Sequence, residues 1–171
     1  KNGICSGCNI HKEKDILDWK YRFNKLKKLV KKYKSKSREN YDCIVPVSGG
    51  KDSTYQVLTL LREAVKPLCV IATTCQLSEI GRKNIENLKS LGVDCIEFST
   101  NPKVRAKLNR IGLKEVGDIS WPEHVAIFTV PPQVATKYKI PLLIWGENSQ
   151  HEYGGPASNA HGKILGRAWL E

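Results

Sequence analysis

From residue 41 onward, the sequence alternates between short apolar runs and stretches whose apolar residues recur at helical spacing. The runs are branched and nearly unbroken, which is typical of buried strands, and they cover residues 41–47, 67–73, 93–98 and 140–145. The helical stretches cover residues 53–64, 79–91, 102–115 and 123–138. This alternation predicts an α/β fold, a doubly wound parallel sheet with helices on both faces.

Prolines refine two of the helical stretches. Asn101 before Pro102 predicts a capped helix start, because proline is favoured in the first turn, where its missing N–H costs nothing. Pro131 and Pro132 lie inside the last helical stretch, where a missing N–H and a ring clash interrupt the backbone ladder. We therefore expect the last helix to be broken into two pieces.

The first 40 residues differ in character from the rest. Residues 15–34 carry apolar side chains at alternating spacings of three and four, which predicts an amphipathic helix with Asp15 as its N-cap. The opposite face of this helix is basic, and residues 34–40 are polar enough to form a linker. A basic helical arm is therefore expected before the sheet.

The formal net charge of +11 is unevenly placed along the chain. Residues 1–40 contain 13 basic and 4 acidic side chains, a balance of +9, whereas residues 41–171 contain 15 and 13, a balance of +2. A nucleic-acid-binding protein would carry its excess charge over a recognition surface, so we do not expect nucleic acid as a partner. The lysines of the arm are expected to face water or an acidic protein surface.

The sequence also bears on the compartment. No apolar run approaches the roughly 20 residues that span a bilayer, and the first residues lack the pattern of a secretory signal. Three of the six cysteines (Cys43, Cys69 and Cys95) lie inside apolar runs, where cysteine acts as a small buried hydrophobe. We predict a cytoplasmic protein with no membrane partner. Because the sequence contains no methionine, we expect a processed chain or a piece of a longer one.

The sequence SGGKDS, from Ser48 to Ser53, follows the first predicted strand and opens a helix. Its two glycines remove side chains that would block a close approach, so backbone N–H groups can converge on an anion such as phosphate. The Walker A pattern is excluded, because Val45 stands where it needs glycine and Asp52 where it needs Ser or Thr. A glycine-rich turn without a ligand is the structural alternative.

SGGKDS resembles the pyrophosphate-binding loop of the PP-loop ATP pyrophosphatases, whose pattern is S-G-G-x-D-S. Those enzymes cleave ATP between its α and β phosphates and adenylate a substrate oxygen. The resemblance implies ATP and Mg²⁺ as cofactors and an adenine nucleotide alpha hydrolase-like domain over residues 41–171. Asp52 would hold Mg²⁺, and Lys51 would offset phosphate charge as a point charge. The residues that would cradle the pyrophosphate are Ser48, Gly49, Gly50 and Ser53.

Longer stretches narrow the resemblance to the N-acetyl sugar amidotransferases of bacterial surface-polysaccharide and nonulosonate pathways. These stretches are YDCIVPVSGGKDSTYQV, EIGRKNIENLKSLGVD, NPKVRAKLNRIGL, GDISWPEHVAIFT and IPLLIWGENSQHEYGGP. The resemblance implies conversion of an acetamido group to an acetamidino group on a nucleotide-linked N-acetyl sugar, with ammonia supplied by a separate glutaminase subunit. Family members are longer, so we expect the domain to be truncated at its C-terminal end.

Further candidates lie where the predicted strands end, because ligands of open parallel sheets bind at that edge. Thr73 ends the second strand and Gly146 follows the fourth, and both are candidate contacts for ATP. Glu147 is a candidate catalytic carboxylate that binds Mg²⁺ or orients the substrate, and Asn148 is a candidate substrate ligand. A glycine turn with solvated polar residues is the alternative at this position.

Two predicted helix starts contribute the remaining candidates. Arg82 can reach the α-phosphate or the sugar, or it can be an ordinary exposed helix arginine. Trp121 and His124 suit a sugar pocket, and an imidazole can move a proton near neutral pH. Pro122 followed by Glu123 is, equally, a common way to begin a helix.

Residues 1–14 contain Cys5 and Cys8 in a C-x-x-C pair, followed by His11. Structural zinc needs four ligands, so this pair is half of a zinc site, and Zn²⁺ stays a candidate cofactor. Members of the resembled family carry a further cysteine pair upstream.

Cys75 keeps a different class of function open. It follows the second predicted strand at the functional edge, as a reactive cysteine of a tRNA-thiolating PP-loop enzyme would, and the basic arm would then contact RNA phosphates. Thiolation usually needs two cooperating cysteines, and a second one is not apparent. A non-catalytic nucleotide-binding subunit is a third class that the length permits.

Overall fold

The computed structural model describes residues 3, 6–37, 39–73 and 77–146. The chain divides into two compact units, one of which is formed by residues 27–146; the other includes the described residues up to 26. Two helices lie in the N-terminal part, α1 (Ser6–Asp15) and α2 (Trp19–Tyr33), and α2 continues into the larger unit. Within the described ranges, no helix is both long enough and apolar enough to cross a membrane.

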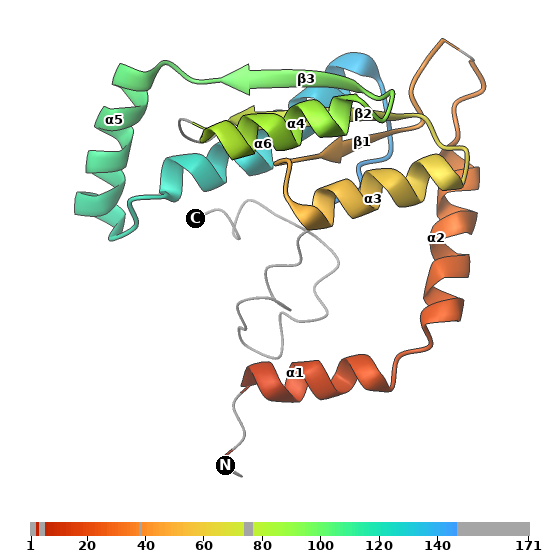
Figure 1. Ribbon diagram of the computed structural model, residues 1–171. Coiled ribbons are helices and arrows are strands. Elements are labelled where there is room, and N and C mark those ends of the chain that lie inside the picture. Colours follow the sequence, from red (N-terminus) through yellow and green to blue (C-terminus); the bar gives the residue numbers. More distant parts are fainter. Residues whose placement is uncertain (1–2, 4–5, 38, 74–76, 147–171) are drawn as a thin grey trace. The chain divides into compact units, whose positions relative to one another are not determined.

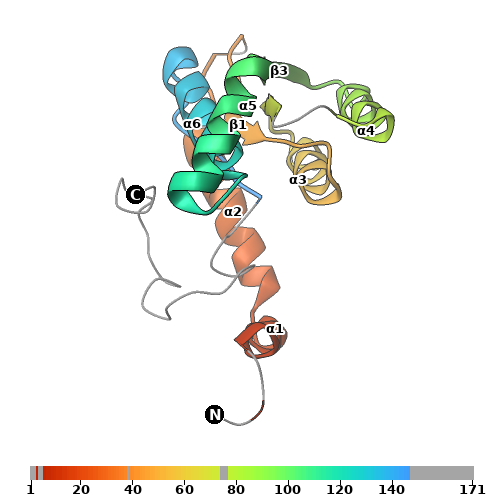
Figure 2. The same cartoon turned by 90° about the vertical axis from the view of Figure 1, so that its left-hand side faces the viewer.

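The larger unit is built on a parallel sheet with the strand order β1-β2-β3. Cys43 pairs with Pro67, and Leu68 pairs with Asp94. Figures 1 and 2 show α3 and α4 on one face of the sheet and α6 on the other. The predicted α/β fold is thus confirmed. Its elements are β1 (Cys43–Pro46), α3 (Lys51–Arg62), β2 (Pro67–Thr73), α4 (Glu79–Lys89), β3 (Asp94–Ser99), α5 (Pro102–Ile111), the π-helical turn η1 (Gly112–Val116) and α6 (Trp121–Tyr138).

The core explains why the strand runs are apolar. Side chains of the sheet meet those of α6 in one buried cluster made of Ile44, Leu68, Val70, Val130 and Ile140. The helices of the opposite face contribute further buried residues, namely Val57, Ile85 and Leu88. Burial of a Val, Leu or Ile side chain contributes about 1.5–3 kcal/mol, so both faces of the sheet stabilise this unit.

The sequence predicts a fourth strand over residues 140–145; these residues lie beside β1 but form less of a strand than that. A single parallel bridge joins Ile44 to Leu143. The Ile44 N–H donates to the Leu142 carbonyl at 2.9 Å, and the Ile144 N–H donates to the Ile44 carbonyl at 2.9 Å. Pro141 has no N–H to donate, which limits the ladder on this side.

The predicted break in the last helix is wrong. α6 runs without interruption from Trp121 to Tyr138, with Pro131 and Pro132 inside it. The Pro131 side chain is fully buried. Packing of this ring into the core compensates for the backbone hydrogen bonds that the two prolines cannot donate.

The predicted start of the N-terminal helix is also wrong. Asp15 ends α1, and α2 begins four residues later at Trp19. Its cap is Asp18, whose carboxylate accepts a hydrogen bond from the Tyr21 N–H at 2.8 Å. Both aspartates are good N-cap residues by type, and the apolar spacing continues through both positions. The Asn101 cap of α5 is confirmed, since its side chain accepts from Lys103 N–H at 2.9 Å.

Candidate functional site

The SGGKDS residues form the turn between β1 and α3. Gly49 has φ +78°, and an added Cβ there would lie 3.1 Å from a side-chain carbon of Ile85 and 3.3 Å from the Ile85 backbone N. Glycine is thus required twice, for the left-handed backbone and for the close approach of α4. The Ser53 hydroxyl donates to the Gly50 carbonyl at 3.1 Å, and this hydrogen bond joins the first turn of α3 to the loop.

The N-terminus of α3 is left open by this turn. Gly50 occupies the N-cap position, and no side chain makes a capping hydrogen bond. First-turn N–H groups without a cap carry the positive end of the helix dipole, which favours an anion. This end of α3 therefore favours a negative charge, and the anion-binding role of the loop stays a prediction.

Two charged side chains, those of Lys51 and Asp52, belong to the first residues of α3. The Lys51 ammonium lies 2.8 Å from a carboxylate oxygen of Asp52, and their side chains are 88% and 78% exposed. An exposed pair of this kind contributes little to stability, so both groups can exchange their mutual contact for a ligand at small cost. Asp52 suits a hard cation and Lys51 suits phosphate oxygens.

Thr73 and Gly146 lie at the same edge of the sheet as the loop. β1 ends at Pro46, which pairs with Val70, and β2 ends three residues further on at Thr73. The Thr73 hydroxyl is buried and has no hydrogen-bond partner within the described residues. At Gly146, an added Cβ would lie 2.9 Å from the side-chain oxygen of Gln56 on α3, which gives that glycine a packing role.

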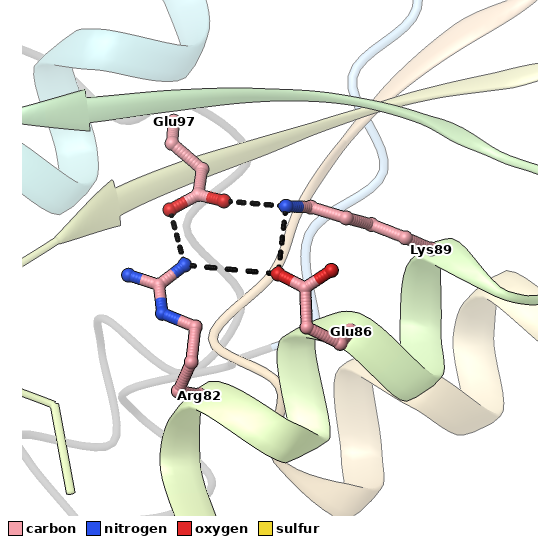
Figure 3. A network of polar contacts seen from close by, with 4 residues as sticks. All are labelled: Arg82, Glu86, Lys89 and Glu97. Atoms are coloured by element: carbon pink, nitrogen blue, oxygen red, sulfur yellow. Dashed lines mark hydrogen bonds and ion pairs between the residues drawn. The ribbon is translucent and has the colours of Figure 1, made fainter. Parts of the chain in front are cut away.

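Arg82 lies in an ion-pair network that joins α4 to β3 (Figure 3). Its guanidinium is 2.8 Å from Glu97, and the Lys89 ammonium lies 2.8 Å from the other Glu97 oxygen and 3.0 Å from Glu86. The bonds from Lys89 and then Arg82 lower the pKa of Glu97, because they favour its charged form. This network accounts for Arg82 structurally, and its contact with ATP stays a prediction.

Trp121 and His124 lie in the first turn of α6. Trp121 is 39% exposed, and His124 Nδ1 lies 3.6 Å from Asp118, with both of these side chains exposed. In the described part of the chain, no hydrogen bond or ion pair joins either residue to the loop. The sugar-pocket prediction therefore rests on their surface position alone.

A polar cluster that sequence reasoning did not single out lies nearby. Arg105 donates from Nη2 to the Thr73 carbonyl at 2.8 Å, and its Nε lies 3.9 Å from Glu123. Asn109 donates to both Glu123 oxygens, at 2.9 and 3.0 Å, and to the Ile119 carbonyl at 2.7 Å. The sequence of α5 shows four basic residues. It does not show which basic side chain turns inward.

The strand cysteines have no catalytic environment. Burial raises the pKa of Cys43 to about 12, and burial raises the pKa of Cys69 as well. A thiol with a raised pKa is a poor nucleophile at neutral pH, so these residues are packing groups, as predicted. Cys8 is exposed on α1. Among the described residues, no group of three or more His, Cys, Asp or Glu side chains is arranged to hold a metal ion.

Several predicted residues fall outside the described part of the chain. They are Cys5, Cys75, Glu147 and Asn148. Their assignments, and the zinc site of which Cys5 would be part, stay predictions.

Comparisons with known proteins bear on the fold. No family model matches the chain, and no curated protein matches it in sequence. An NH3-dependent NAD synthetase from Campylobacter jejuni, solved with a nitrate ion, superposes with a TM-score of 0.54 at 15% identity, over 78% of this chain and 58% of the synthetase. For an NMN synthetase from Francisella tularensis the TM-score is 0.49 at 15% identity, over 74% and 55% of the two chains. The chain thus shares the fold of the NAD synthetase and spans 58% of that protein's length.

Proposed function

We propose that this chain is an ATP-dependent amidotransferase that forms AMP and pyrophosphate, and that its substrate is an N-acetyl sugar linked to a nucleotide. The observation that supports it most is the uncapped N-terminus of α3 behind the SGGKDS loop, at the carboxyl end of β1. The ammonia dependence in the name of the C. jejuni synthetase agrees with ammonia as the nitrogen source. In this proposal a glutaminase subunit supplies that ammonia.

The loop residues fit the triphosphate of ATP. Gly49 and Gly50 place no side chain over the turn, no side chain among the described residues caps α3, and the helix dipole favours negative charge there. Asp52 would bind Mg²⁺, which usually takes one or two carboxylates together with phosphate oxygens. Lys51 would neutralise the charge that develops on the departing pyrophosphate.

Bound ATP supplies the activation that an amide oxygen needs before nitrogen can replace it. In the proposed first step, the acetamido oxygen attacks the α-phosphorus, the bond to the β-phosphate breaks, and pyrophosphate leaves from the loop. In the second step, ammonia attacks the acetamido carbon, the carbon–oxygen bond breaks, and AMP leaves with that oxygen. The loop therefore acts in the first step, by holding and stabilising the leaving group.

The test is a product assay on the full-length protein. Incubation with ATP, Mg²⁺, ammonium and a panel of UDP-linked acetamido sugars should release AMP and pyrophosphate. It should also convert the acetamido group of the sugar to an acetamidino group, an exchange of O for NH that mass spectrometry detects. Release of ADP, or release of AMP that needs tRNA and not sugar, would contradict the proposal.

A matched pair of variants tests the loop assignment. Asp52→Ala should abolish AMP formation while the far-ultraviolet circular dichroism stays unchanged, because Asp52 is exposed and its removal leaves the core intact. Glu79→Ala is the control, since Glu79 is also an exposed acidic residue in a helix first turn, that of α4. Equal turnover of Asp52→Ala and wild type would refute the role of the loop.

A further inference from the structure

α5 extends the site beyond the sheet. Figures 1 and 2 show this helix past the end of β3, on the side where the loop also lies. The helix contains four basic residues and no acidic one. Three of the basic side chains are exposed, and Arg105 is the one that is mostly buried, with 15% of its side chain exposed. The three exposed basic residues are Lys103, Lys107 and Arg110.

Arg105 is positioned by a hydrogen bond that occupies only part of its guanidinium. Its contact with the Thr73 carbonyl fixes one end of the guanidinium at the end of β2. A guanidinium has five N–H donors, and within the described residues Arg105 donates only this one hydrogen bond. The other four donors of this mostly buried cation have no hydrogen-bond acceptor among the described residues.

Glu123 offsets the charge of Arg105 but does not occupy its donors. The 3.9 Å between Arg105 Nε and Glu123 is too long for a hydrogen bond. Asn109 draws the carboxylate away, because its amide donates to both Glu123 oxygens at 2.9 and 3.0 Å. The cluster thus orients the Arg105 guanidinium while leaving N–H donors without an acceptor in the described part of the protein. A guanidinium fork of this kind can make a bidentate pair of hydrogen bonds to an oxyanion.

Two threonine hydroxyls lie where β2 and β3 end, the edge that Arg105 contacts through the Thr73 carbonyl. Thr73 is at the end of β2, and Thr100 directly follows β3. Both hydroxyl oxygens are buried without a hydrogen-bond partner in the described part of the chain. Unsatisfied buried polar atoms are uncommon and costly, so a ligand that supplies partners at this edge would recover that cost.

We propose that Arg105 is a substrate-binding residue for a second oxyanion, separate from the pyrophosphate held by the SGGKDS loop. This proposal rests on the proposed function and adds the residue that would bind the substrate. The ligand chemistry is a phosphate group carried by the sugar substrate. The loop follows β1, and Thr73 ends β2, the parallel strand paired with β1, so the two anion subsites would lie at the same edge of the sheet.

Binding measurements on the full-length protein test this proposal. The loop is first saturated with Mg²⁺ and adenylyl imidodiphosphate, and then UDP or N-acetylglucosamine 1-phosphate is titrated by calorimetry. Arg105→Gln should weaken the binding of the phosphate probe about tenfold or more, and Arg105→Lys should weaken it less, because an ammonium keeps the charge but not the fork. Lys107→Gln, an exposed neighbour on the same helix, should change it less than threefold.

Glu123→Gln separates ligand binding from a structural role. Removal of the carboxylate leaves Arg105 without its offsetting charge, so the probe should bind more tightly than to wild type. A purely structural brace would instead be weakened by both the Arg105 and the Glu123 variants. Circular dichroism and the unfolding midpoint of each variant establish that it is folded.

The outcomes are distinct. A wild-type protein that binds neither probe, or an Arg105→Gln variant that binds as tightly as wild type, would overturn the Arg105 subsite. Failure of adenylyl imidodiphosphate to bind would overturn the proposed function instead, and phosphate probes titrated alone would still report on Arg105. UDP binding without sugar phosphate binding would assign the subsite to a nucleoside diphosphate, and the reverse to a sugar phosphate.

Discussion

Gly49 combines a left-handed backbone with contact against α4, and the two requirements can be separated by mutation. Gly49→Ala should lower the free energy of unfolding by about 1–2 kcal/mol from backbone strain, and by more because the new Cβ meets Ile85 at 3.1 Å. Gly92→Ala is the matched control, since Gly92 has φ +84° and nothing within 4 Å of an added Cβ. Urea denaturation of both variants measures the difference. Equal destabilisation would mean that the contact with α4 carries no cost.

Asp42 is a buried carboxylate that joins three segments. One oxygen accepts from the Ser35 N–H at 2.7 Å and the other from the Lys66 N–H at 2.8 Å, and the residue is 4% exposed. Asp42→Asn should lower the free energy of unfolding by about 1–3 kcal/mol, because an amide NH2 replaces one acceptor oxygen inside the protein and can no longer accept from its part-buried backbone N–H. Asp52→Asn makes the same change at an exposed site and should have a much smaller effect. A loss of similar size in both variants would contradict this account.

At the scale of elements, the Glu97 network fastens α4 to β3. Because the pKa of Glu97 is lowered in the folded protein, its charged form contributes stability above the ordinary value of 4.5, and that contribution is lost as the pH falls through the lowered pKa. Glu97→Gln should therefore be less stable than wild type near pH 7, by less than about 1 kcal/mol since the partners are exposed. The difference should shrink as the pH falls below 4.5.

Denaturation of both proteins across this pH range checks the prediction. Glu79→Gln serves as the control, because Glu79 is an exposed residue in the first turn of α4. A difference that is constant from pH 3 to pH 7 would show that Glu97 acts by packing and not by charge.

The sequence predicts elements best where a local pattern has one physical solution. The Asn101-Pro102 start and the SGGKDS turn are such cases, because both are set by the chemistry of neighbouring residues. The continuity of α6 could not be predicted, since it depends on the burial of Pro131 against strands far away in the sequence. The inward turn of Arg105 depends likewise on Thr73 and Glu123, which no spacing rule brings together.

At the scale of the whole molecule, charge is the property with a measurable consequence. Lys20 and Lys31 lie exposed on α2, in the basic arm, whereas Lys83 and Lys137 lie exposed on the nearly neutral body. Replacing either pair with Gln removes the same net charge. Replacement of the pair on the arm should cause the larger drop in the salt concentration at which the protein elutes from a cation exchanger. The reason is that clustered charge binds a charged surface more strongly than dispersed charge.

Unfolding midpoints should be unchanged in both double variants, since exposed lysines contribute little to stability. Equal elution shifts would show that net charge alone controls retention and that the arm is not a distinct electrostatic surface.

The pairing of the strands also bears on the order in which the protein folds. β1 pairs with β2 and β2 with β3, so each of these neighbours in the sheet is also the next strand along the chain. Among the described residues, the opposite edge of β1 is met at Ile44 by residues 142–144, which follow α6 and are far from β1 in sequence. Contacts between distant residues form slowly because the loop that they close is long. During synthesis, the strand that precedes the SGGKDS loop therefore has one open edge until residues 142–144 have been made, and in that interval it is exposed to pairing with another chain.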